Sequence, residues 1–326
     1  MTVLTINGGG HWADKFVDAA SQVIVQFGYE ASSIEEIWPI LRQVDFFSVH
    51  YTPVVAWAMR ELPAGSRLYA HFHTAPNSDN DVQVITRAVG RCQRVAFPTA
   101  SSREEYGALI EADQQSLFLD KTGVLPNIAD PQFMLARISA RKRQDLSVAV
   151  VARLDRDKTS PDLLLETIFR VCTILPQVRF LIAGYGEDLL FIRKEITAAR
   201  LDGRVQTLGF VENVQDIYGS ADVVFLPSVS EVMPYAALEA LQFGVPCVIP
   251  DVVDVGPLGS EMIELCRANS PESCAKSIVR LLKSIRSEGP QSHGAVARTG
   301  EWTSLVMDWF SEPFAVDGAE LFQRGH

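Results

Sequence analysis

The chain has 326 residues, 47% of them hydrophobic and 21% charged, and its formal net charge at pH 7 is -11. This length is more than one hydrophobic core usually serves, so two domains of similar size are expected. The composition is typical of a soluble globular enzyme and excludes a largely disordered chain. The acidic charge argues against nucleic acid and anionic membrane surfaces as default partners.

Cysteine usage and the N-terminus indicate a cytoplasmic protein. The five cysteines are widely spaced and form no C-x-x-C pair, so reduced and mostly buried thiols are expected. The first residues are typical of a short strand followed by glycines and not of a signal peptide. No apolar run approaches the roughly 20 residues of a membrane span. One dense basic stretch, residues 137–143, is expected to be a solvated linker, and the alternative is a weak contact with an anionic lipid or an acceptor.

Short apolar runs alternate with amphipathic stretches in the first half of the chain. The apolar runs predict strands at residues 3–6, 45–49, 67–72 and 94–97. The amphipathic stretches predict helices at residues 12–27, 54–62, 82–89 and 101–110.

The second half of the chain repeats this rhythm. Strands are predicted at residues 146–151, 178–183, 205–208, 223–226 and 246–249. Helices are predicted at residues 161–174, 188–199, 214–219, 235–243 and 271–285.

Most of these strands are rich in Val, Ile and Leu with little polar alternation, which is typical of parallel strands buried on both faces. Strand–helix alternation twice over predicts an α/β protein with two doubly wound, Rossmann-like domains. Charge is dense and apolar periodicity lapses near residues 138–145, where the two domains are expected to join. Such sheets bind ligands at the carboxyl ends of their strands, so the strand-ending loops are expected to carry the chemistry.

The first loop of interest in the second half follows the strand at residues 146–151. Its Arg153 and Lys158 could neutralise a diphosphate, the arginine as a fork and the lysine as a point charge. The alternative is a pair of solvated loop charges. Asp155 and Asp157 form a D-x-D that could hold a metal-bound diphosphate, but the flanking cations favour simple pairing with these acids.

Two further loops are individually weak signals. Gly184 and Gly186 could let backbone amides approach a ligand closely, and the next helix would then present its N-terminus to an anion. A plain turn explains the two glycines equally well. Phe210, in a Gly-Phe turn, could pack against a flat base, and the alternative is a core phenylalanine.

The fourth loop follows the strand at residues 223–226 and carries two acids around a helix start. Pro234 suits a first helical turn, and the amides of Met233 to Ala236 can then face an anion. Glu231 lies before the helix and Glu239 about a turn and a half into it. One carboxylate could bind sugar hydroxyls and the other ribose hydroxyls. The alternative is that Glu231 caps the helix and Glu239 is an ordinary surface residue. This alternative explains one glutamate better than it explains both in this arrangement.

In order and spacing these four loops resemble the family 4 retaining glycosyltransferases of the GT-B fold, over roughly residues 146–282. The family's landmarks correspond here to Arg153 with Lys158, Gly184 with Gly186, Gly209-Phe210, Ala221-Asp222, and Glu231 with Glu239. Residues 7–10 resemble the family's glycine loop near the diphosphate and the acceptor. Residues 70–74 resemble the segment with a strand-end histidine beside the reacting sugar, for which His73 matches better than His71.

The resemblance implies a domain organisation and an activity. It implies an acceptor-binding domain over residues 1–144, a nucleotide-sugar-binding domain over 145–300, and a helix and tail over 301–326 that cross back to the first domain. It implies transfer of a sugar from a nucleotide-diphosphate-sugar donor to an acceptor hydroxyl with retention of anomeric configuration. No metal and no cofactor apart from the donor are expected. The acceptor could be a carbohydrate, a lipid-linked sugar or a small molecule, and the oligomeric state is left open.

The resemblance also implies residue roles. The expected catalytic residues are Glu231, His73, Arg153 and Lys158. The expected donor-binding residues are Gly9, Gly10, Gly184, Gly186, Phe210, Met233, Pro234, Tyr235 and Glu239.

The chain departs from the family pattern after the first glutamate, where Val232 and Met233 replace the usual glycine and phenylalanine. The first domain is also shorter than is usual in the family. These departures keep open a non-catalytic homologue that supports another transferase, and the fold keeps open a sugar-nucleotide epimerase. A nicotinamide dehydrogenase is disfavoured because no G-x-G-x-x-G precedes an acid by about 20 residues in the right context.

Overall fold

The computed structural model describes residues 2–6, 22–26, 47–76, 78–127, 146–256 and 262–288, the first two ranges by their backbone alone. The chain divides into two compact units. One comprises Met1–Phe97 with Arg103–Gly123, and the other comprises Pro98–Ser102 with Val124–His326. The domain boundaries expected from the sequence stay predictions.

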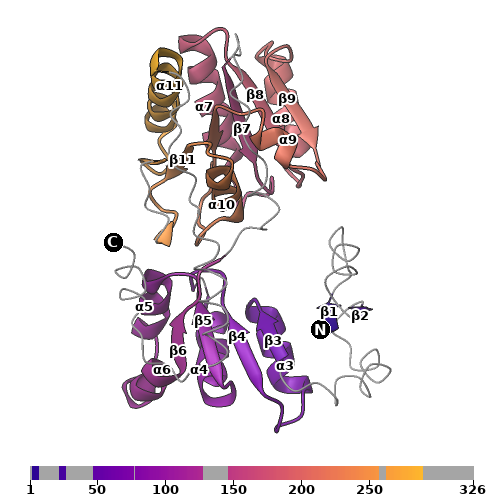
Figure 1. The fold of residues 1–326 in the computed structure, drawn as a ribbon, viewed down its shortest axis with the longest axis vertical. Coiled ribbons are helices and arrows are strands. Elements are labelled where there is room, and N and C mark those ends of the chain that lie inside the picture. Colours follow the sequence, from indigo (N-terminus) through magenta and orange to yellow (C-terminus); the bar gives the residue numbers. More distant parts are fainter. Residues whose placement is uncertain are drawn as a thin grey trace. The chain divides into compact units, whose positions relative to one another are not determined.

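The first unit is built around a four-stranded sheet (Figure 1). Its strand order is β3 (Phe47–His50), β4 (Leu68–His71), β5 (Arg94–Phe97) and β6 (Thr122–Val124). The pairs β3–β4 and β4–β5 are parallel, and each is connected by a helix, as parallel neighbours require. The helices are α3 (Thr52–Glu61), α4 (Asp79–Arg91), α5 (Ala100–Ala108) and α6 (Gln115–Lys121).

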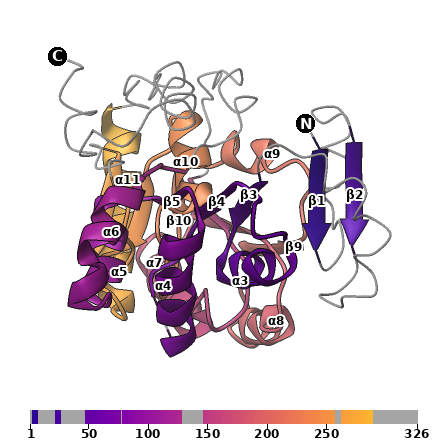
Figure 2. The same cartoon turned by 90° about the horizontal axis from the view of Figure 1, so that it is seen from below.

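Two further strands near the N-terminus pair with one another in parallel, β1 (Thr2–Ile6) and β2 (Gln22–Gln26) (Figure 2). The expected strand at residues 3–6 is confirmed. The helix expected over residues 12–27 is wrong at its end, where β2 lies. The physical reason is the consecutive Val23, Ile24 and Val25, whose β-branched side chains favour a strand over a helix.

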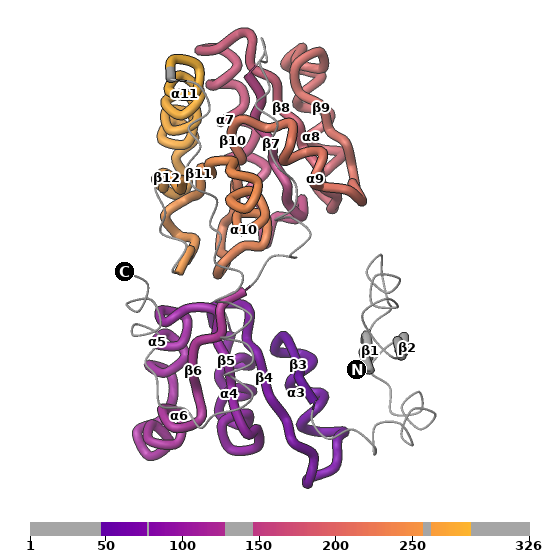
Figure 3. The backbone as a smooth tube through the Cα atoms, viewed as in Figure 1, coloured from indigo at the N-terminus to yellow at the C-terminus, as the bar shows by residue number. Residues whose placement is uncertain are grey.

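The second unit contains a six-stranded sheet whose neighbouring traces can be followed in Figure 3. The strand order is β12 (Ile263–Cys266), β11 (Cys247–Pro250), β10 (Val223–Phe225), β7 (Ser147–Val151), β8 (Arg179–Ala183) and β9 (Val205–Gly209), and each adjacent pair is parallel. The order runs outward from β7 to β9 on one side and from β10 to β12 on the other. The chain therefore reverses direction across the sheet between β7 and β10, which is the switch point where such sheets bind ligands.

Both faces of this sheet are covered. Val148 and Val150 of β7 pack into a core with α7 (Pro161–Ile174), α8 (Leu189–Ala198) and α11 (Pro271–Glu288). Ala149, between them, packs into a second core with α9 (Gln215–Tyr218) and α10 (Tyr235–Gln242). Successive residues of a strand point to opposite faces, so the apolar runs of the sequence are explained by burial on both sides.

The strand β5 and the helix α7 have the bounds that were expected, and the remaining expected elements are found with small shifts at their ends. Besides β2, four short elements of the described residues were not expected, namely α6, β6, β12 and the 3-10 helix η3 (Ala112–Gln114). The five cysteines are free and buried, as expected. Within the described ranges, no helix is both long and apolar enough to cross a membrane. The basic stretch at residues 137–143 and the tail at 301–326 lie outside the described residues.

Candidate functional site

The loops after β7 and β10 are joined along their backbones at the switch point. Thr159 and Ser228 form an antiparallel bridge. On one side of the bridge the Val229 amide donates to the Lys158 carbonyl at 2.9 Å, and on the other the Ser160 amide donates to the Pro227 carbonyl at 3.0 Å. This backbone pairing holds Lys158 beside the segment that leads to Glu231.

Glu231 is a half-buried acid within this pair of loops. Its Oε2 accepts a hydrogen bond from the Ser228 hydroxyl at 2.7 Å. Burial raises the pKa of the Glu231 carboxyl, while the Ser228 hydrogen bond and the charges of Lys158 and Arg153 act in the opposite direction. The charges of Lys158 and Arg153 therefore act on Glu231, although the three residues come from two loops about 75 residues apart.

Arg153 pairs with both acids of the D-x-D. Its Nε lies 2.9 Å from Asp155 Oδ2, and its Nη2 lies 3.0 Å from Asp157 Oδ2. Asp155 Oδ1 also accepts the Glu187 amide at 2.9 Å. The two acids are thus engaged with a cation and a backbone donor, which favours the pairing explanation over a metal–diphosphate site.

Gly184 and Gly186 let the loop after β8 pass close to the loop after β7. A Cβ atom on Gly184 would lie 1.9 Å from the Ala152 carbonyl oxygen, and one on Gly186 would lie 2.3 Å from the Leu154 carbonyl oxygen. The Gly184 amide donates to the Gly209 carbonyl at 2.7 Å. The first glycine therefore serves the packing of neighbouring loops, and its amide is used inside the protein.

Two exposed aromatic rings follow the neighbouring strands β8 and β9. Tyr185 is 57% exposed and Phe210 is 44% exposed, so Phe210 is not a core residue. Their ring centroids lie 5.9 Å apart with an edge-on orientation. Tyr185 was not expected at the site from the sequence. Its placement beside Phe210 makes it part of the same surface.

The segment before α10 departs in detail from what was expected. Met233 is buried with a left-handed φ of 45°, and its amide donates to the Asp254 carbonyl at 2.7 Å. The expectation that the Met233 amide faces an anion is therefore wrong. Pro234 is the N-cap of α10, and its ring offers no acceptor to the first-turn amides. The positive end of the helix dipole remains as the feature that attracts an anion.

Asn127 supports this segment from a distant part of the chain. Its buried side chain donates from Nδ2 to the Met233 carbonyl at 3.0 Å and accepts the Tyr235 hydroxyl at 3.4 Å. No local sequence pattern signals this contact, which spans 106 residues.

Glu239 is oriented by a buried tyrosine. The Tyr218 hydroxyl of α9 donates to Glu239 Oε2 at 2.7 Å. Burial and then the Glu239 charge raise the pKa of Tyr218 well above its ordinary value, so this phenol stays a hydrogen-bond donor. The half-buried carboxylate on α10 thus has one oxygen fixed by α9.

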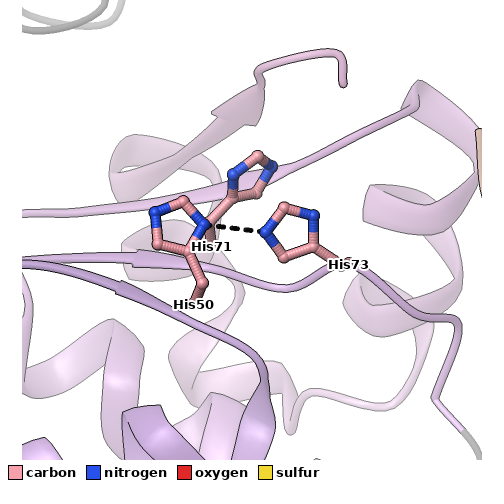
Figure 4. Close-up of side chains that lie close together, drawn as sticks. All are labelled: His50, His71 and His73. Carbon is pink, nitrogen blue, oxygen red and sulfur yellow. Dashed lines mark hydrogen bonds between the residues drawn. The ribbon is translucent and has the colours of Figure 1, made fainter. Parts of the chain in front are cut away.

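The expected histidine lies in the first unit, within a group of three. His73 follows β4, His71 ends β4, and His50 ends β3. His50 Nδ1 lies 2.8 Å from His73 Nε2 (Figure 4). Protein atoms crowding the His50 ring remove water from it and lower its pKa, although the residue as a whole is exposed. Gly9 and Gly10 lie outside the described residues.

Residues 145–284 match the family described as Glycosyl transferases group 1, which confirms the resemblance seen in the four loops. Over 178 residues the chain is 26% identical to the phosphatidylinositol N-acetylglucosaminyltransferase GPI3 subunit of Saccharomyces cerevisiae, covering 51% of this chain and 38% of that protein. Over 117 residues it is 33% identical to the alpha-monoglucosyldiacylglycerol synthase of Acholeplasma laidlawii, covering 34% and 29% respectively. The chain spans well under half the length of these curated relatives.

The fold is similar to that of Anabaena HepE in complex with UDP and glucose, with a TM-score of 0.77 and 16% identity over 95% of this chain and 91% of that chain. At this level of identity the likeness establishes the fold alone. The GT-B fold class expected from the sequence is confirmed.

Proposed function

We propose that this chain, whose residues 145–284 match the family described as Glycosyl transferases group 1, transfers a sugar from a nucleotide-diphosphate-sugar donor to an acceptor hydroxyl. The observation that carries the proposal is the convergence of Glu231, Lys158 and Arg153 at the switch point of the six-stranded sheet. This reaction requires two kinds of group at one place. One is an acid that accepts hydrogen bonds from sugar hydroxyls, and the other is a pair of cations that bind phosphate.

The cations act on the leaving group. Departure of the nucleoside diphosphate places negative charge on phosphate oxygens, which Lys158, Arg153 and the N-terminal end of α10 stabilise electrostatically. Arg153 exchanges its two aspartate partners for phosphate when the donor binds. This exchange is cheap because Arg153 is half-exposed, and exposed ion pairs contribute only about 0–1 kcal/mol.

The sugar, the ribose and the base of the donor are bound by other residues of the proposed site. Glu231 accepts hydrogen bonds from hydroxyls of the donor sugar and so orients it. Glu239, which is oriented by the hydrogen bond from Tyr218, accepts hydrogen bonds from the ribose hydroxyls. Phe210 and Tyr185 provide apolar surface for the base, and Pro234 and Tyr235 form the start of the helix that meets the diphosphate.

Three of the expected residues enter this proposal through the family resemblance alone. His73 belongs to the first unit and is proposed to contact the donor sugar. Gly9 and Gly10 are proposed to approach the diphosphate.

Retention of configuration, independence of metal ions and a cytoplasmic location are parts of the same proposal. UDP is the proposed nucleotide, supported by the similarity in fold to HepE, which was crystallised with UDP and glucose. A lipid-linked acceptor is supported by two relatives whose names contain phosphatidylinositol and diacylglycerol. One of those relatives is named as a subunit, so a protein partner also belongs to the proposal.

The test begins with binding and ends with turnover. The full chain is screened by thermal shift against UDP, GDP, ADP and CDP, and the corresponding nucleotide sugars are then incubated with phosphatidylinositol, glycolipid and free-sugar acceptors. We expect UDP to raise Tm and UDP to be released in proportion to a glycosylated product. A Tm unchanged by every nucleotide diphosphate would contradict the donor site and favour a non-catalytic partner.

A further inference from the structure

Three imidazole rings converge at one end of the four-stranded sheet in the first unit. The parallel register pairs His50 of β3 with His71 of β4, and residues two apart on an extended chain point to the same side, which brings His73 to His71. The ring centroids of His71 and His73 lie 4.0 Å apart, and His50 lies 5.4 and 5.1 Å from them. One ring nitrogen of each histidine lies within 4.8 Å of the others (Figure 4).

The backbone beside these rings is strained. Tyr51, directly after His50, has φ 68° and ψ 141°, a region that is essentially restricted to glycine and costs a side-chain-bearing residue about 1–3 kcal/mol. Its amide donates to the His71 carbonyl at 3.0 Å, and its ring lies 4.7 Å from the His73 ring. The strained residue therefore links the ends of β3 and β4 where the histidines meet, as is common at functional sites.

The donor set suits a transition-metal ion. Neutral imidazole binds Zn²⁺, Cu²⁺ and Ni²⁺, whereas Mg²⁺ and Ca²⁺ prefer oxygen ligands. Three histidines with a fourth position open to water make a recognised zinc arrangement. His71 is buried, His73 half-buried and His50 exposed, so the group is open to solvent on the His50 side.

The ring nitrogens lie within 4.8 Å of one another, so all three rings must move to share one ion. Zinc–nitrogen bonds of about 2.0–2.1 Å in a tetrahedron separate the ligand nitrogens by roughly 3.3 Å. His50 Nδ1 and His73 Nε2 lie 2.8 Å apart, so these rings must separate by roughly half an ångström. With Nδ1 on the metal, His50 Nε2 carries the proton and donates to Ser48 Oγ, which lies at 3.1 Å. Such a second hydrogen bond orients metal-binding histidines.

We propose that His50, His71 and His73 bind one divalent transition-metal ion of the zinc type, with water in the remaining position. The ion would not serve the transfer chemistry. It would occupy the ring nitrogen of His73 and so inhibit transfer, a consequence that rests on the proposed function, whereas metal binding itself does not.

The test uses the full chain freed of metal, titrated with Zn²⁺ by calorimetry and with Co²⁺ by visible absorption. We expect one ion per chain and the intense absorption of a tetrahedral cobalt site. His50→Ala, chosen because His50 is exposed and outside the proposed transfer site, should weaken binding at least about 10-fold. Gln83→Ala, at an exposed position of α4 in the same unit, is the control and should bind as the wild type does. Absence of stoichiometric binding, or equal affinity in His50→Ala, would overturn the proposal.

A second readout separates this proposal from the transferase proposal. Zn²⁺ should inhibit sugar transfer by the wild type, EDTA should reverse the inhibition, and His50→Ala should resist it. Stoichiometric, His50-dependent binding by a chain that transfers no sugar would support the metal site and contradict the proposed function. Sugar transfer by a chain that binds no zinc would support the proposed function and contradict the metal site.

Discussion

The Val229 amide donates a hydrogen bond to the Lys158 carbonyl at 2.9 Å, and this contact ties the loop after β10 to the loop after β7. Glu231 lies two residues beyond Val229. The positions of a cation and an acid are therefore coupled through the backbone of the two loops.

Glu231→Gln is expected to stabilise the protein at neutral pH while abolishing most transfer. Burial raises the pKa of Glu231 in the folded state, so its ionised form is disfavoured there. A carboxyl with a raised folded pKa contributes stability below its unfolded pKa and loses it as the pH rises through the folded pKa. A glutamine side chain does not ionise, so Glu231→Gln does not lose this stability as the pH rises.

We expect Tm of Glu231→Gln to exceed that of the wild type at pH 7.5, because the buried carboxyl must ionise at that pH and the amide need not. The difference should shrink as the pH is lowered toward 4.5, the ordinary value for glutamate. Glu166→Gln, at an exposed position of α7, is the control and should leave Tm unchanged. A lower Tm for Glu231→Gln at pH 7.5 would contradict the account.

Phe210→Ala and Tyr185→Ala are expected to weaken binding of the nucleoside diphosphate. Contact of a base with an aromatic ring contributes about 1–3 kcal/mol, so Kd for UDP should rise roughly 5- to 150-fold, as measured by calorimetry. Phe191→Ala removes a partly exposed ring from α8 in the same unit and should leave Kd unchanged. Equal effects of all three substitutions would indicate a general loss of stability.

Tyr218→Phe is expected to affect donor binding through Glu239. The variant loses the 2.7 Å hydrogen bond to Oε2, whose net contribution is about 0.5–1.5 kcal/mol. KM for the donor should rise about 2- to 13-fold with little change in kcat, because ribose binding precedes the chemical step. Tyr106→Phe removes the hydroxyl of another fully buried tyrosine and should leave KM for the donor unchanged. A fall in kcat at constant KM would contradict the role given to Glu239.

Gly184→Ala is expected to destabilise the second unit strongly. The added Cβ would lie 1.9 Å from the Ala152 carbonyl oxygen, and relief requires the loops after β7 and β8 to separate. We expect a loss of roughly 2 kcal/mol or more in the free energy of unfolding. Gly203→Ala, where nothing lies within 4 Å of the added atom, should stay within about 0.5 kcal/mol of the wild type in denaturant titrations.

The sequence predicted most of the second unit because its signals are local. Helix α7 has the expected bounds, since Ser160 accepts the Leu163 amide as an N-cap and Pro161 occupies the first turn. Strand β6 was missed because three residues carry no periodic pattern. Strand β12 was missed because its burial is partial, with Glu264 paired to Arg280 of α11.

The residues expected at the site stay predictions, and some of the contacts around them could not be expected from the sequence. Loop order indicated Arg153, Lys158 and Glu231. The cations that flank Asp155 and Asp157 also indicated pairing with these acids, and Arg153 pairs with both. The amide of Met233 is taken by Asp254, a backbone contact over 21 residues that no local pattern signals. The three-histidine group depends on strand register, which brings His50 to His71 across 21 positions of sequence.

The most direct test of the central claim is acceptor-dependent release of UDP from a UDP-sugar by the wild type, Lys158→Ala and Lys194→Ala. Lys194 is an exposed lysine of α8 and serves as the charge-matched control. We expect Lys158→Ala to lose at least about 100-fold in kcat, the scale for removal of one group that stabilises developing charge, with an unchanged Tm. Lys194→Ala should match the wild type. Transfer by Lys158→Ala at the wild-type rate would contradict the assignment of the diphosphate to the joined loops.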